Sequence, residues 1–235
     1  MTAGAPGALI GRGRRADVYD LGDGRVLRRY REGPRQVEQE ADVMTHARSH
    51  GVPVPEVFDV AGTTDLILEA VIGPTMLEDL TRRPWRVVDH SRTLARLHNL
   101  VHAVDALEWL RAPFGPGNRL LHVDLHPENV ILTKRGPQII DWEGAAQGPA
   151  EADIAMCWVL MRTSEIPGPP VQRRVGAAGQ ALFSRLFLSA CPGLDTSWLA
   201  TAAEYRIADP TVTARERTRL ARLSGRHHRR AGRTR

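Results

Sequence analysis

Three polar residues near the middle of the chain have the types and the spacing that phosphoryl transfer needs. Asp124 lies in the run HVDLHPEN at residues 122–129, Asn129 follows it by five positions, and Asp141 comes twelve positions after Asn129. Such chemistry requires one group to orient the attacking hydroxyl and two groups to hold Mg²⁺ against the nucleotide phosphates. The spacing therefore predicts a phosphoryl-transfer centre that uses ATP and Mg²⁺.

Apolar runs flank these residues and predict the elements that hold them. Residues 130–132 and 139–140 are β-prone, so a short hairpin is expected between Asn129 and Asp141. The alternative is a chance arrangement of loop carboxylates. Because the three positions agree in type, order and spacing, we favour the catalytic interpretation.

The first third of the chain predicts a small antiparallel sheet with one helix. Glycine-bearing turns alternate with β-prone runs over residues 9–30, and the turn at 22–24 predicts a hairpin. A helical pattern then starts after Pro34 and ends at Gly51. Two further strands are expected at about residues 56–60 and 65–70.

Helix dominates after a Gly-Pro break at residues 73–74, which suits a connector between two lobes. Apolar residues at intervals of three and four over 87–110 predict one long amphipathic helix that runs toward the catalytic segment. The pattern is helical again after residue 150, with a loop at 166–170.

Composition places the chain among ordinary globular proteins. It has 235 residues, of which 42% are hydrophobic and 25% charged. The sequence contains no run of about 20 apolar residues, and residues 1–10 lack the pattern of a secretory signal. We therefore expect a cytoplasmic protein with no membrane partner.

The net charge of +5 comes from the C-terminal end. Residues 211–235 carry nine arginines and one glutamate, a net +8, whereas residues 1–210 carry 23 basic and 26 acidic residues, a net −3. We expect this basic tail to be solvated and disordered. Binding of nucleic acid through the tail is the weaker alternative and would depend strongly on salt.

Two cysteines and two histidines have spacings that bear on metal binding. Cys157 and Cys191 lie in apolar contexts without CxxC spacing, so core packing is expected for both. His98 and His102 lie four residues apart on one face of the predicted helix. No third ligand is evident in the sequence, so ordinary packing or surface histidines are favoured over a metal pair.

Residues 11–18 fit the pattern G-x-G-x-x-G-x-V, with Ala16 in place of the third glycine. Alone, this match indicates no more than a glycine turn between strands. At the start of a β-rich segment and upstream of a catalytic run, it predicts that the backbone at Gly11 and Gly13 approaches nucleotide phosphates. Val18 would then pack on the adenine.

The order of these motifs resembles that of the aminoglycoside phosphotransferase and choline kinase-like family, a relative of protein kinases, over roughly residues 9–160. His126 and Pro127 point to its small-molecule branch, since protein kinases usually carry Lys where His126 stands, and no Ala-Pro-Glu triplet follows Asp141. The resemblance implies an α+β, two-lobed, protein-kinase-like fold. Its N-lobe would span residues 1–72 and its mainly helical C-lobe residues 73–210.

The resemblance also implies roles for single residues. Asp124 would orient the substrate hydroxyl or accept its proton, and Asn129 and Asp141 would ligate Mg²⁺. Asp153 matches a later family Asp whose expected role is to brace the catalytic loop. Glu143 follows Asp141 closely enough to reach the metal shell or a basic partner, and the alternative is an exposed turn carboxylate.

The phosphate-contacting lysine of the third strand is absent. The single lysine of the chain, Lys134, lies in a turn after the catalytic loop. The position falls on Arg28, which is expected to point toward the nucleotide and to pair with Glu40, while Arg29 faces the opposite side of the strand. Arginine keeps the charge and binds phosphate oxygens bidentately, but its fork is bulkier than an ammonium.

The sequence thus predicts a monomeric small-molecule kinase that moves the γ-phosphate of ATP to a hydroxyl. The alternative is a catalytically weak, kinase-like protein that binds a nucleotide or ligand in a regulatory role. Few carboxylates follow Asp153, which disfavours a polycationic aminoglycoside; they are Glu165, Asp195, Glu204, Asp209 and Glu216. Aromatic residues suited to a choline cage, or to a core, are Trp158, Phe183, Phe187, Trp198 and Tyr205. Neither pattern identifies the substrate.

Overall fold

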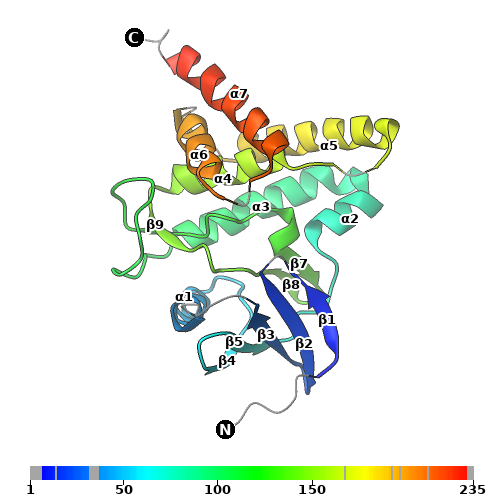
Figure 1. The fold of residues 1–235 in the computed structure, drawn as a ribbon, viewed down its shortest axis with the longest axis vertical. Helices are drawn as coiled ribbons and strands as arrows, with labels where there is room; N and C mark the ends of the chain where they lie inside the picture. Colours follow the sequence, from blue (N-terminus) through cyan, green and yellow to red (C-terminus); the bar gives the residue numbers. More distant parts are fainter. Residues whose placement is uncertain are drawn as a thin grey trace.

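The N-terminal part of the fold is a five-stranded antiparallel sheet with one helix beside it (Figure 1). The structure, a computed structural model, describes residues 7–13, 15–31, 37–166, 168–191, 193–195, 197–210 and 212–231, with side chains as far as Ser224. The strands lie in the order β1-β2-β3-β5-β4. The elements are β1 Leu9–Arg12, β2 Ala16–Gly22, β3 Arg25–Tyr30, α1 Val37–Ser49, β4 Val57–Ala61 and β5 Asp65–Glu69.

The predicted hairpin joins β2 and β3 and aligns two of the predicted nucleotide-binding residues. Its turn has φ angles of 75° at Gly22, 51° at Asp23 and 74° at Gly24, a left-handed backbone that glycine adopts without strain. The pairing places Val18 directly opposite Arg28. Residues paired in this way present their side chains to the same face of a sheet.

Helix α1 buries the face that its apolar spacing predicts. Val37, Ala41, Met44 and Ala47 are all buried. Glu40 belongs to the same face and is only 5% exposed. A carboxylate in such a position needs a partner, because burying an unpaired charge is very unfavourable.

Helices dominate the C-terminal part, together with two short strand pairs (Figure 1). The expected α+β class, with a sheet and helix followed by a mainly helical part, is confirmed. The helices are α2 Met76–Arg82, η1 Pro84–Arg86, α3 Val87–His102, η2 Pro127–Asn129, α4 Ala150–Thr163, α5 Pro170–Ser189, α6 Ser197–Ile207 and α7 Ala214–Ala231. The strands are β6 Arg119–Leu121, which pairs with β9 Ala146–Gly148, and β7 Val130–Thr133, which pairs with β8 Gly136–Ile139.

The connector between the two parts passes very close to β7. A Cβ atom at Gly73 would lie 2.1 Å from the carbonyl oxygen of Leu132, so only glycine fits there. Thr75 then caps α2 in a capping box with Glu78, and Thr75 also bridges to Ile131. The predicted division at residues 72 and 73 falls in this connector and stays a prediction.

Helix α3 ends eight residues earlier than its apolar periodicity predicts, at His102. The following segment pairs with the chain before β6, since Ala106 N–H donates to Asn118 O at 2.7 Å and Leu120 N–H donates to Val104 O at 2.9 Å. Val104 is still buried there. The apolar spacing thus continues, but these backbone hydrogen bonds replace those of a helix.

The basic tail also differs from the expectation of disorder. Residues 214–231 form α7, which contacts α6 and α4. Val212 and Leu220 are buried in the cluster that these helices share, and Leu223 packs against it. Three apolar side chains therefore anchor a segment whose composition is otherwise that of a solvated tail. Residues 232–235 lie outside the described residues.

Two apolar clusters fill the interior. The larger one joins the two parts, because it contains residues of α1 and β5 as well as α3, β7, β8 and α5. The smaller one lies under α4, α6 and α7. Cys157 and Cys191 are buried and form no disulfide, in agreement with the expected packing role. None of the described helices combines the length and the apolar composition of a membrane-spanning segment.

Candidate active site

The loop between β6 and β7 brings two of the predicted catalytic residues into contact. Nδ2 of Asn129 donates to the backbone oxygen of Asp124 at 2.8 Å and to its Oδ2 at 3.0 Å. Nε2 of His126 lies 3.6 Å from Asp124 Oδ1. Two side chains of the HVDLHPEN run, those of His126 and Asn129, therefore converge on the carboxylate of Asp124.

This environment favours the ionised form of Asp124. Partial burial raises the pKa of Asp124, but the interaction with His126 and its positive charge outweigh burial, so the pKa lies below its usual value. Burial lowers the pKa of His126, but the interaction with Asp124 outweighs it and raises the pKa above its usual value. A carboxylate that stays charged can accept a hydrogen bond from a substrate hydroxyl.

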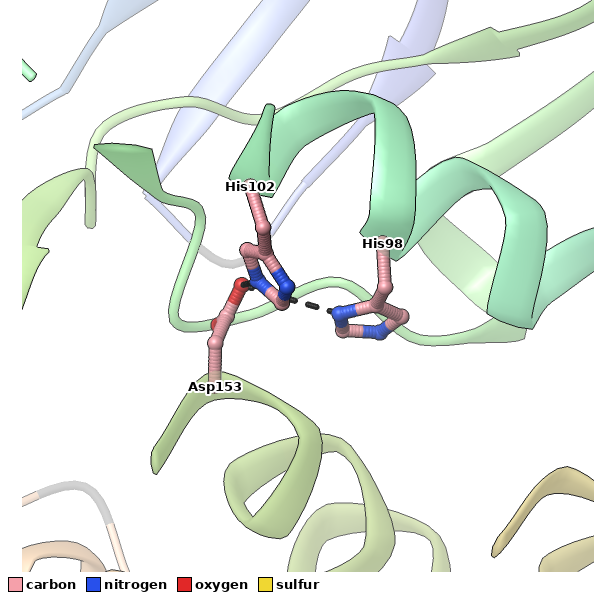
Figure 2. Close-up of side chains that lie close together, drawn as sticks. All are labelled: His98, His102 and Asp153. Atoms are coloured by element: carbon pink, nitrogen blue, oxygen red, sulfur yellow. Dashed lines mark hydrogen bonds and ion pairs between the residues drawn. The ribbon is translucent and has the colours of Figure 1, made fainter. Parts of the chain in front are cut away.

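The backbone before Asp124 is strained and is held by a buried carboxylate. Val123 has φ 70°, which is rare for a β-branched residue and costs on the order of 1–3 kcal/mol. Asp153 Oδ1 accepts the Val123 N–H at 2.7 Å, and Oδ2 accepts the His122 N–H at 3.2 Å. His102 Nε2–H donates to Oδ2 at 2.9 Å (Figure 2). The bracing role expected of Asp153 agrees with these bonds.

His122 connects the loop to the strand that leads to Asp141. Its Nδ1 accepts the Asp124 N–H at 3.3 Å, which leaves the ring proton on Nε2 for the Ile140 carbonyl at 3.1 Å. Burial lowers the pKa of His122, so the ring is neutral. The spacing of the sequence did not indicate this role, because the bond to Ile140 spans 18 residues.

Arg28 joins the sheet, α1 and the predicted metal ligand. Its Nη1 donates to Glu40 at 2.7 Å and its Nη2 donates to Asp141 at 2.5 Å. Tyr30, two positions along β3, donates its hydroxyl to Glu40 at 2.5 Å and lies under the guanidinium. The predicted pairing of Arg28 with Glu40 is thus present, and Arg29 faces the other side and pairs with Asp65. Tyr30 was missed, although strand alternation places it on the face of Arg28.

At the junction of Arg28, Glu40 and Asp141, the attraction between opposite charges compensates for their removal from water. Burial lowers the pKa of Arg28, but the carboxylates of Glu40 and Asp141 outweigh it and raise the pKa well above its usual value. Burial also raises the pKa of Glu40, against the effect of Arg28 and of the Tyr30 hydroxyl. Asp141 itself is reached from solvent, with a side chain 41% exposed, and its φ of 67° turns the chain away from β8.

The glycine-bearing segment faces this junction. Gly11 is paired with Val18 across β1 and β2, and Gly13 N–H donates to Ala16 O at 2.8 Å to close the turn. Arg15 pairs with Glu143 at 3.0 Å, which brings the turn over the segment that follows Asp141. Glu143 therefore has a basic partner and is not a free turn carboxylate. Arg14 lies outside the described residues.

A cavity of about 400 Å³ lies on the α1 side of the Asp141–Glu143 segment. Glu40, Tyr30, Trp109, Trp142 and Glu143 are among its lining residues. Asp124 and Asn129 are not, so this cavity is not the place where a hydroxyl would meet the predicted catalytic carboxylate.

Comparison with known proteins supports the expected family and fold. A sequence model of the phosphotransferase enzyme family matches residues 7–116 and 67–189. Thiamine kinases of Salmonella paratyphi B and Salmonella newport are 44% identical over 39 residues, which are 17% of this chain and only 14% of those relatives.

Two solved structures share the fold over nearly the whole chain. A choline/ethanolamine kinase family protein from Mesorhizobium loti has a TM-score of 0.57 and 16% identity, and the match covers 97% of this chain and 88% of that one. The amicoumacin kinase hAmiN, in complex with AMP-PNP, Ca²⁺ and Ami, has a TM-score of 0.55 and 15% identity over 94% and 87% of the two chains. The expected kinase-like fold is confirmed.

Proposed function

The chain belongs to the phosphotransferase enzyme family, and on this premise we propose that it transfers the γ-phosphoryl group of ATP to a hydroxyl of a small molecule. The observation that carries the proposal is the contact of Arg28 with Asp141. It links the sheet that bears the glycine turn to the residue expected to hold Mg²⁺. The nucleotide would then lie between the turn and the catalytic loop.

The proposed metal ligands offer the donor atoms that Mg²⁺ prefers, which are carboxylate and amide oxygens. Asp141 presents a partly exposed carboxylate. Asn129 commits its Nδ2 to Asp124, which leaves Oδ1 for a cation. When bound, Mg²⁺ neutralises the charge of the nucleotide phosphates.

The remaining chemistry falls to residues of the chain. Asp124 accepts the hydrogen bond of the substrate hydroxyl and aligns it for in-line attack, while Arg28 places positive charge beside the phosphates. Backbone N–H groups near Gly11 and Gly13 hold the phosphates, and Val18 covers the adenine. No covalent enzyme intermediate is required.

Arginine in place of lysine suits the junction at Arg28. Its two terminal nitrogens reach two different carboxylates at once, on α1 and after β8. A lysine ammonium is one point charge, whereas the planar guanidinium holds both partners in fixed directions. The replacement is thus compatible with positioning of the nucleotide.

The acceptor is a small molecule of undefined class. The aromatic residues considered for a choline cage pack in the interior: Phe183 and Phe187 are buried in the larger cluster, and Trp158, Trp198 and Tyr205 pack against the smaller one. This favours packing roles for them. The thiamine and choline kinase relatives support a small hydroxylated substrate without identifying it.

One observation favours the alternative, a nucleotide- or ligand-binding protein with weak turnover. The Arg28 guanidinium contacts Asp141 Oδ1 at 2.5 Å and thereby competes with a cation for that oxygen. If the contact between Arg28 and Asp141 persisted when ATP binds, Asp141 could not hold Mg²⁺, and ATP would bind with little dependence on Mg²⁺.

Calorimetry can test both the phosphotransferase and the binding-protein proposal. ATP binding is measured with and without Mg²⁺, and ATP hydrolysis is measured in the same samples. We expect Mg²⁺-dependent binding that is lost in Asp141→Asn and kept in the control Asp42→Asn, which makes the same change on the exposed face of α1. Slow hydrolysis by the parent chain supports a phosphotransferase. Mg²⁺-independent binding without hydrolysis would support the binding protein, and no binding by the parent chain would reject both.

A further inference from the structure

Two histidines and one aspartate form a buried cluster beneath the catalytic loop. Figure 2 shows the imidazoles of His98 and His102 extending from α3 toward Asp153 on α4. His98 and Asp153 are fully buried, and His102 is 9% exposed. One donor atom from each of the three lies within 4.8 Å of the other two.

The hydrogen bonds of His98 leave one of its nitrogens without a partner. Its Nε2–H donates to the Leu125 carbonyl at 3.3 Å, so Nδ1 carries a lone pair. That atom is buried, has no hydrogen-bond partner, and lies 3.6 Å from Asp153 Oδ2. A lone pair and a carboxylate oxygen at this distance repel each other unless a positive charge lies between them.

No guanidinium or ammonium forms an ion pair with Asp153 in the described part of the chain, where its contacts are the two histidines and two backbone N–H groups. Buried charges in proteins are normally paired or coordinate a metal. The positive charge beside Asp153 is therefore either a proton added to one of the two histidines or a metal ion.

We propose that His98 Nδ1, His102 Nε2 and Asp153 Oδ2 bind one divalent cation of the zinc type. Bonds of about 2.0–2.1 Å in a tetrahedral site put ligand atoms roughly 3.3 Å apart. The observed separations from Oδ2, 2.9 Å to His102 and 3.6 Å to His98, lie on either side of that value. Two imidazoles and one carboxylate suit Zn²⁺ better than Mg²⁺ or Ca²⁺, which prefer oxygen ligands.

The surrounding bonds already orient the ligands as a metal site requires. The Leu125 carbonyl fixes the His98 tautomer that exposes Nδ1, and the Val123 N–H fixes Asp153 Oδ1. On binding, the ring proton of His102 moves from Nε2 to Nδ1. The ion would tie α3 and α4 to both ends of the Val123–Leu125 segment, and this role does not depend on the proposed phosphoryl transfer.

Metal content of the purified full chain tests the proposal, with zinc added, the excess removed by gel filtration, and the remainder measured by mass spectrometry. We expect one equivalent of zinc per chain. In His98→Gln, the affinity for zinc should fall by more than ~10–100-fold, which is the loss expected when a residue that only orients a ligand is removed. Glutamine keeps an N–H that can donate to the Leu125 carbonyl, but it has no imidazole nitrogen in the position of His98 Nδ1. Cobalt substitution of the parent chain should give visible absorption bands that are absent from His98→Gln.

His46→Gln is the matched control. His46 lies on α1 in an exposed pair with His50, and its Nε2 also donates to a backbone carbonyl, that of Asp105, at 2.8 Å. Its zinc content should equal that of the parent. If His98→Gln fails to fold, the parent chain decides alone. Absence of zinc and cobalt binding by the parent chain would overturn the proposal, and so would equal zinc binding by folded His98→Gln.

Discussion

Replacing Arg28 by methionine should weaken folding, because Glu40 then loses its cationic partner. The side chain of Glu40 is 4% exposed and that of Arg28 is 14% exposed. Removing one partner of a buried ion pair costs roughly 3–5 kcal/mol. Glu40 keeps the Tyr30 hydroxyl, and burial already raises its pKa, so it takes up a proton in the variant and the loss is reduced to about 2–3 kcal/mol. The contact with Asp141, whose side chain is 41% exposed, adds at most ~1 kcal/mol.

Urea unfolding followed by circular dichroism near neutral pH measures this free energy. Arg29→Met is the control, because Arg29 is the next residue of β3 and pairs with Asp65 on the opposite face. Its side chain is 35% exposed, so we expect a loss of about 1 kcal/mol.

A double-mutant cycle with Glu40→Gln separates the ion pair from other effects of the changes. If the charges interact as described, the Arg28→Met, Glu40→Gln double variant is more stable than the sum of the single losses by about 1.5–3 kcal/mol. The reasoning is refuted if Arg28→Met costs no more than Arg29→Met, or if the two changes at the junction are additive.

Three further outcomes are expected elsewhere. Asp124→Asn should keep Mg²⁺-dependent ATP binding and lower turnover by ~10²–10⁴-fold, which a coupled assay of ADP release checks. The hydrogen bond with buried His90, together with the charges of Arg86 and Arg83, lowers the pKa of Asp79. Asp79→Asn should therefore be less stable than the parent above pH ~4, and the difference should shrink as the pH falls further. Unfolding measured from pH ~7 to ~3 checks this. Gly73→Ala should lower the melting temperature by several degrees, because the new Cβ atom meets the carbonyl oxygen of Leu132. Gly179→Ala is the control and should not lower it, because no atom lies within 4 Å of a Cβ at that position. Equal melting temperatures of the two variants would contradict the close approach at Gly73.

The junction at Arg28 was predicted partly from the resemblance to the kinase-like family and partly from local pattern. The pairing of Arg28 with Glu40 was expected from the resemblance, whereas the separation of Arg28 from Arg29 follows from strand alternation, a short periodicity. The hairpin β7–β8 was predicted in the same way, from apolar runs on both sides of a turn. These features depend on neighbours in sequence and on one contact between adjacent elements.

Packing of distant helices was not predictable from pattern. His98 and His102 are 55 and 51 residues from Asp153, so their spacing reveals the helix face but not what covers it. Nothing in the sequence indicated that Asp153 packs against the face that bears these two histidines. Composition likewise did not indicate α7, in which Leu220 is buried and Leu223 packs beside it.

The bond from Asp153 to the Val123 N–H also has a consequence for the order of synthesis. The two residues are 30 positions apart, and Asp153 is made later. As the chain leaves the ribosome, Asp124 and its neighbours emerge before the carboxylate that holds their backbone in its left-handed turn. The loop therefore takes its final shape only after α4 has been translated and has packed on α3, and a nascent chain that stops before α4 contains the whole HVDLHPEN motif without the geometry that the motif needs.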